Sequence, residues 1–105
     1  MKEIIFLGSS LEAIKDVSAD ARSEVEYQLR QIQRGGDPTD WKPMKTVGQK
    51  VRELRMREAS GAFRVIYLAT LADRVLVLHA FQKKTQQTAQ HDIDLAAARL
   101  KAWRE

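Results

Sequence analysis

The chain has 105 residues, no cysteine and a net charge of +4. This length fits one domain around one core, and the lack of cysteine excludes disulfide bonds, thiolate nucleophiles and thiolate metal sites. No apolar run approaches the roughly 18 residues of a membrane-spanning helix, and the first seven residues are too short and too acidic for a signal peptide. We therefore expect residues 1–105 to form a single cytoplasmic domain without a membrane partner.

The first third of the chain predicts one strand and two helices. The apolar run at residues 4–7 is typical of a short strand. Ser9 and Glu12 have the spacing of a capping box for a short helix, and Ser18 can cap a longer helix that ends at the glycine pair 35–36. Apolar side chains recur in the longer helix at helical spacing, at Ala21, Val25, Leu29 and Ile32.

Residues 35–50 form a long connection between these helices and the next strand. Two prolines and three glycines in this segment argue against a regular element. Long loops in small domains are often functional or held by a few anchors. We expect Trp41 and Met44 to be the anchors here; the alternative is that Trp41 merely covers the edge of the core.

The second half of the chain predicts a meander and a last helix. Alternating apolar residues joined by short turns indicate three antiparallel strands, at residues 51–57, 62–69 and 74–82. Thr88 can cap a final helix over residues 89–103. The predicted fold is therefore α+β, in the order β-α-α-β-β-β-α, with a mostly antiparallel sheet and helices packed against it.

The positive charge is concentrated on the central segment. Residues 42–84 hold 10 basic and 3 acidic side chains, whereas residues 1–41 hold 5 basic and 8 acidic ones. A basic surface of this kind favours a polyanion, most simply a nucleic acid. The alternative is that these charges serve solubility.

The meander carries the residues expected to bind RNA. Arg55 and Arg57 project from one face of their strand, and Arg64 faces one of them across the turn, depending on its register. Guanidinium groups can clamp phosphate, and Phe81 or Tyr67 can stack a base. The competing interpretations are that the two arginines are solvated strand residues and that Tyr67 belongs to the core.

Cleavage of RNA requires further groups. When the 2′-hydroxyl of RNA attacks its own phosphorus, one group must take its proton, another must stabilise the charged phosphorane, and a third must protonate the leaving oxygen. Arg64 suits the second task. His79 is a candidate acid or base, and Lys83 or Lys84 is a candidate if crowding by like charges lowers its pKa. His79 can instead be a structural histidine, and the lysine pair a solvated strand exit.

No metal or cofactor is required by this chemistry, and the two histidines lack a matching carboxylate cluster. Three motifs then carry a resemblance to a known family: VRELR at residues 51–55, GAFRVIY at 61–67 and LHAFQKKTQQT at 78–88. In order and spacing they resemble the phage-derived, HigB-like branch of the RelE/ParE toxin superfamily. Ala89 departs from the proline often found there in the family, which affects helix capping and not chemistry.

The resemblance implies the RelE-like fold and the toxin of a type II toxin–antitoxin system. Such toxins typically enter the ribosome and cut mRNA through the 2′-hydroxyl route, and a small helix-turn-helix antitoxin usually blocks them. Arg64 matches the arginine that contacts the scissile phosphate, and Arg55 and Arg57 lie where relatives place basic residues. His79, Lys83 and Lys84 match the family signature, with the general acid and base left open.

Two other functions remain open at this stage. One is a protein-binding poison of the same fold, as in the gyrase-inhibiting ParE branch, which tends to lack the basic set. The other is a non-catalytic nucleic-acid-binding regulator. The sequence leaves the codon preference, the identity of the antitoxin and the oligomeric state open.

Overall fold

A computed structural model of the chain describes residues 1–58, 61–83 and 87–105. The predicted α+β fold is confirmed, with one additional short strand, β2. The elements, in chain order, are β1 (Glu3–Phe6), α1 (Ser10–Lys15), α2 (Ala19–Gln33), β2 (Trp41–Pro43), β3 (Arg52–Glu58), β4 (Gly61–Leu68), β5 (Arg74–Lys83) and α3 (Gln90–Arg104).

The strands form one sheet in the order β1-β5-β4-β3-β2. The predicted meander β3-β4-β5 is antiparallel, and β1 joins its far edge parallel to β5. Arg64 lies directly opposite Arg55 in the β3–β4 register, which answers the question left open by the turn. The predicted turn at residues 59–61 falls partly outside the described residues.

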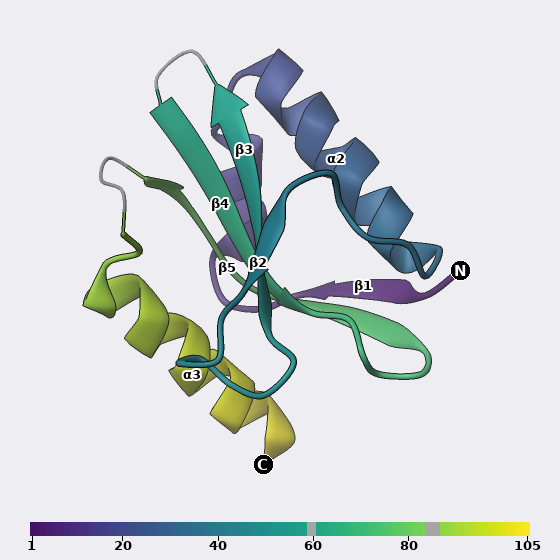
Figure 1. Cartoon of the computed structure of the whole chain (residues 1–105), viewed down its shortest axis with the longest axis vertical. Coiled ribbons are helices and arrows are strands. Elements are labelled where there is room, and N and C mark those ends of the chain that lie inside the picture. Colours follow the sequence, from purple (N-terminus) through teal and green to yellow (C-terminus); the bar gives the residue numbers. More distant parts are fainter. Residues whose placement is uncertain (59–60, 84–86) are drawn as a thin grey trace.

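Helices cover both faces of the sheet, and each face has its own core (Figure 1). We call the side covered by α1 and α2 the α2 face and the opposite side the α3 face. The core of the α2 face joins Val25, Leu29 and Ile32 to alternate residues of the strands. On the α3 face, Ala96 and Leu100 pack against the strand residues that point away from α2. Most of the meander is therefore buried on both sides of the sheet. No helix of the described residues is long and apolar enough to cross a membrane.

The connection at residues 35–50 is more regular than its composition predicts. Trp41–Pro43 forms the edge strand β2 and pairs antiparallel with β3. Pro43 has no backbone N–H to donate, and it is tolerated because one side of an edge strand has no neighbouring strand to pair with. Met44 is buried, as expected of an anchor, and Val47 joins it in the core of the α3 face.

A β-bulge in β5 changes which side chains face α3. The register moves from Ile66 opposite His79 to Tyr67 opposite Val77, so Leu78 is the extra residue. Leu78 packs in the core of the α3 face, and the His79 ring contacts two residues of α3. Two consecutive side chains therefore point to the same face, which strict alternation does not allow.

One of the three expected helix caps is present. The Ser18 hydroxyl accepts a hydrogen bond from the Ala21 backbone N–H at 3.2 Å, as predicted for α2. Ser9 and Thr88 do not cap α1 and α3 with their side chains, so these two predictions are wrong. Both hydroxyls are instead engaged in tertiary hydrogen bonds, which are described below.

Candidate nucleic-acid interface

The sheet register gathers the basic residues of the meander on its α3 face. Arg64 of β4 lies between Arg55 of β3 and Phe81 of β5, and Lys83 lies one step further along, opposite Ala62. The α3 helix covers the other end of this face, around Leu76 and Leu78, and leaves the basic end outside the helical core. We call Arg55, Arg57, Arg64 and Lys83 the basic face.

Burial differs sharply among the four members of the basic face. Arg64 is 8% exposed and Lys83 is 5% exposed, whereas Arg55 is half-buried and Arg57 is exposed. Charged side chains are rarely so buried without a partner, because leaving water is costly for an ion. The two buried cations therefore require a compensating negative charge.

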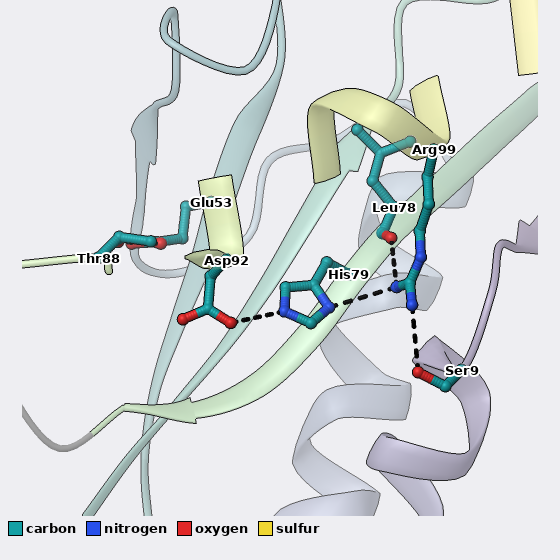
Figure 2. Close-up of polar contacts among 7 residues, drawn as sticks. All are labelled: Ser9, Glu53, Leu78, His79, Thr88, Asp92 and Arg99. Atoms are coloured by element: carbon teal, nitrogen blue, oxygen red, sulfur yellow. Dashed lines mark hydrogen bonds and ion pairs between the residues drawn. The ribbon is translucent and has the colours of Figure 1, made fainter. Parts of the chain in front are cut away.

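The carboxylate of Glu53 supplies that charge. Glu53 is fully buried, and its Oε1 lies 3.5 Å from Nε of Arg64 and 3.7 Å from Nζ of Lys42. Its other oxygen, Oε2, accepts a hydrogen bond from the Thr88 hydroxyl at 2.7 Å (Figure 2). The Glu53 carboxylate thus contacts β2, β4 and the segment before α3, from the same sheet face as Arg55 and Arg57.

Several donors on the basic face still lack an acceptor. Among the described residues, Nε of Arg55, Nε of Arg64 and Nζ of Lys83 are buried and make no hydrogen bond. Arg64 does donate from Nη1 to the backbone oxygens of Met56 and Phe63, at 3.4 and 3.3 Å. Within the described part of the chain, Oε1 of Glu53 also makes no hydrogen bond, and it faces Nε of Arg64 at 3.5 Å. Buried donors are normally satisfied, so Nε of Arg55 and Nζ of Lys83 are the donors best suited to an incoming oxyanion.

The pKa of Lys83 moves in the direction that proton transfer requires. Burial lowers the pKa of this ammonium, Glu53 opposes the change, and neighbouring cations reinforce it. Those cations are Lys42, Arg64 and Arg55. Burial also lowers the pKa of the Arg64 guanidinium, which remains charged at physiological pH because arginine starts so high.

His79 is held between two residues of α3. Its Nε2 lies 2.7 Å from Oδ1 of Asp92, and its Nδ1 lies 3.3 Å from Nη1 of Arg99 (Figure 2). Because a guanidinium can only donate, Nδ1 accepts and the proton sits on Nε2. Burial lowers the pKa of His79, the hydrogen bond to Asp92 opposes this, and the charge of Arg99 adds to it.

Arg99 extends this chain of contacts to the residue before α1. Its Nη1 also donates to the Leu78 carbonyl at 3.0 Å, and its Nη2 donates to the Ser9 hydroxyl at 3.2 Å (Figure 2). One side chain of α3 thus joins β5 to the start of α1. His79 in turn stacks on Phe81, with ring centroids 4.9 Å apart and planes at 17°. We call His79, Asp92 and Arg99 the His79–Asp92–Arg99 framework, and His79 connects it to the aromatic ring beside Arg64.

The structure brings together part of the predicted site. Arg55, Arg64, Phe81 and Lys83 share one end of the α3 face, and Arg57 lies in the next row. His79 lies one row behind them, with both ring nitrogens engaged. Lys84 lies outside the described residues.

Tyr67 is not brought to this group. It is 1% exposed and packs in the core of the α2 face, because it lies three positions after Arg64 and side chains alternate along β4. Its ring therefore lies on the opposite side of the sheet from the basic face.

Sequence reasoning did not single out four residues that support the site. The sequence indicates Thr88 only as a helix cap, and it does not single out Glu53, Asp92 or Arg99. The signal available in the sequence was the position of two acids, Glu53 within the basic segment and Asp92 just after it, as possible counter-ions. No group of three or more potential metal ligands occurs among residues 1–58, 61–83 and 87–105.

Comparison with known families places the chain. The model of a family described as phage-derived protein Gp49-like (DUF891) matches residues 12–101. The chain belongs to this Gp49-like family. No curated protein matches the sequence significantly.

The Gp49-like match covers the whole candidate interface. It spans α1 to α3, including Glu53, the basic face and the His79–Asp92–Arg99 framework, and omits β1. The family assignment therefore applies to the part of the chain that carries the basic site. The family description itself names no activity.

Proposed function

We propose that this Gp49-like protein is the toxin of a type II toxin–antitoxin system, a ribosome-dependent endonuclease that cuts mRNA and stops translation. The observation that carries the proposal is the gathering of Arg55, Arg64 and Lys83 on one sheet face, where buried donors of Arg55 and Lys83 make no hydrogen bond to a described residue and Arg64 is paired with Glu53. The resemblance of the three sequence motifs to HigB-like toxins supports the same conclusion. The site of action is then the cytoplasm, where ribosomes and mRNA are found.

The chemistry follows the 2′-hydroxyl route. The 2′-oxygen loses its proton and attacks the adjacent phosphorus, the bond from phosphorus to the 5′-oxygen breaks, and the 5′-oxygen receives a proton. The products are a 2′,3′-cyclic phosphate and a free 5′-hydroxyl. No cofactor enters this balance.

Arg64 and Arg55 bind the reacting phosphate in this proposal. The two residues lie directly opposite each other on adjacent strands, so both guanidinium groups can donate to the non-bridging oxygens. The charge on these oxygens grows in the transition state, and buried donors are strongest there because water does not screen them. Phe81, half-exposed beside Arg64, is the proposed stacking surface for a base.

Lys83 is the proposed proton-transfer group. Its lowered pKa brings the neutral amine closer to physiological pH, where a general acid or base works best. His79 is proposed to position Phe81 and the strand exit, because Asp92 and Arg99 occupy its ring nitrogens. Lys84 remains a candidate for either step.

The partners follow from the same proposal. They are mRNA on the ribosome and a helix-turn-helix antitoxin that blocks the basic face. The test is expression of the chain with its Arg64→Gln variant, followed by translation rate and mRNA integrity. Arrest with mRNA cuts by the wild type alone supports the proposal. Binding of RNA without cuts supports a regulator, and DNA damage signalling without cuts supports a gyrase poison.

A further inference from the structure

A pocket of about 180 Å³ lies on the side of the sheet away from the basic face, beside the C-terminal end of α2. Charged and hydroxyl side chains dominate its polar lining: Lys2, Asp37, Lys50, Arg52, Tyr67 and Thr70. A water molecule takes roughly 30 Å³, so the space holds a tetrahedral phosphate with some water. None of these residues belongs to the proposed nuclease site. Tyr67, which the sequence predicts as a stacking residue, lies on the opposite side of the sheet.

We propose that this pocket binds a phosphate-class oxyanion, at a second site separate from the basic face. The lining offers three cations against one carboxylate, and that carboxylate is already engaged. Asp37 accepts from Nη1 of Arg52 at 2.8 Å. Nζ of Lys2 also donates, to the Ala69 backbone oxygen at 2.6 Å. The lining keeps a net positive charge, which is complementary to an anion.

Tyr67 provides the first independent support. Its hydroxyl is buried and, among the described residues, makes no hydrogen bond of acceptable geometry. Arg52 comes near enough to oppose the rise in the pKa of Tyr67 that burial causes, but a guanidinium cannot accept the phenol proton. A phosphate oxygen at the pocket supplies the missing acceptor.

The backbone of Lys50 provides a second observation in support of the phosphate site. Lys50 has a φ angle of +68°, in the left-handed region that glycine or asparagine adopts more easily. The exposed Lys50 side chain lines the pocket. Strain of this kind is often found at ligand sites.

Arg52 is held in place before any ligand arrives. Its guanidinium carbon lies 3.7 Å from the centre of the Trp41 ring, and Asp37 fixes one of its nitrogens. A fixed cation loses little freedom on binding, so its contribution to affinity is larger. Trp41 is also a fluorescent reporter in direct contact with the proposed site.

The competing explanation is that these cations stabilise the negative end of α2. The last four carbonyls of α2, those of residues 30–33, already accept from backbone N–H groups of Arg34, Gly36, Gly35 and Lys2. The helix end therefore does not require side-chain donors. A helix-stabilising role also predicts no dependence on phosphate, which makes the two explanations separable.

The test uses the full chain carrying Trp103→Phe, so that Trp41 alone reports. Inorganic phosphate, a nucleoside 5′-monophosphate and a single-stranded RNA without terminal phosphate are titrated, with chloride at equal ionic strength as the reference. We expect saturable changes in Trp41 fluorescence with at least one phosphate ligand and none with chloride. The tightest of the three ligands identifies the source of the phosphoryl group.

Matched variants locate the binding. Lys50→Gln should weaken the affinity by about tenfold, as expected for a lost charge-assisted hydrogen bond, and Tyr67→Phe by roughly fivefold. Lys101→Gln, an exposed lysine of α3, should leave it unchanged. Absence of saturation, an equal response to chloride, or identical affinities for Lys50→Gln and Lys101→Gln would overturn the proposal. Arg64→Gln should bind phosphate here normally, so this result is independent of the nuclease function.

Discussion

The Thr88 hydroxyl donates to the buried carboxylate of Glu53 at 2.7 Å, which joins the segment before α3 to the centre of the sheet. The same carboxylate faces Arg64 at 3.5 Å. The entry to α3 and the arginine proposed to bind phosphate therefore share one counter-ion. Thr88 lies one residue before Ala89, the N-cap of α3, and its hydroxyl is bonded to Glu53 instead of to the helix.

Thr88→Asp distinguishes the two roles of this position. Aspartate is a good N-cap and favours the positive end of a helix, so a capping role predicts unchanged or higher stability. If Thr88 instead supports Glu53, the new aspartate places a second carboxylate beside the buried one and removes the hydrogen bond that Thr88 donates. We expect a loss of roughly 2 kcal/mol in urea unfolding, of the order measured when a buried group loses its partner. Thr46→Asp, on an exposed turn, is the control and should change little.

Glu53→Gln tests whether this carboxylate balances the basic face. The amide keeps the volume and a hydrogen-bonding oxygen but removes the charge that faces Arg64 and Lys42. We expect a loss of about 3 kcal/mol, within the range for breaking a buried ion pair, and a further fall in the pKa of Lys83, because Glu53 opposes that fall. Chemical unfolding and NMR titration of the lysine measure the two effects. An unchanged stability, equal to that of the exposed control Glu12→Gln, would contradict this account.

The free energy of unfolding should fall as the pH falls through the range in which histidine usually titrates. Burial holds the pKa of His79 below its unfolded value of about 6.5. Between the folded and unfolded pKa values the unfolded chain binds more protons, so stability rises with pH there and is lost as pH falls. The surrounding charges are Asp92, Arg99 and His91.

His79→Gln should reduce this pH dependence, whereas His91→Gln, at an exposed position, should leave most of it. Unfolding free energies measured at pH 7.5 and 5.5 give the comparison. NMR of the ring nitrogens at neutral pH should show the proton on Nε2, as the contact from Arg99 to Nδ1 requires. Equal pH dependence in wild type and His79→Gln would show that His79 is not the responsible group.

Lys83→Arg separates proton transfer from phosphate binding. Arginine retains the positive charge but does not give up a proton near neutral pH. If Lys83 transfers a proton, mRNA cleavage should fall by about 100-fold or more, the usual contribution of general acid–base catalysis, while RNA binding persists. Lys101→Arg is the matched control on α3. Full cleavage by Lys83→Arg would restrict this residue to binding.

The fold followed from sequence patterns because each element carries a local signal. Alternation and short turns defined the meander, and helical spacing defined the long helices. β2 was missed because three residues with a proline show no period. The register that pairs Arg64 with Arg55 depends on the turn between β3 and β4, which composition does not specify.

The polar contacts of the site were harder to predict, because they join residues far apart in the chain. Ser9 and Thr88 carry good capping signals, yet Arg99 and Glu53 compete for their hydroxyls at sequence separations of 90 and 35 residues. The bulge at Leu78 is likewise invisible in the alternation of β5, although it sets which face His79 occupies. The chemistry of the basic face could be predicted from its residue types. Which of these residues come into contact depends on tertiary packing.

The central claim concerns Arg64, and mapping of cut 5′ ends tests it most directly. Purified ribosomes carrying a defined mRNA are incubated with the wild type, with Arg64→Gln, and with Arg30→Gln as a control at an exposed position of α2. Circular dichroism and thermal unfolding first establish that all three fold alike. We predict discrete 5′-hydroxyl ends with the wild type and the control, and a loss of about 100-fold or more with Arg64→Gln. Intact mRNA with the folded wild type, or equal cutting by folded Arg64→Gln, would contradict the account.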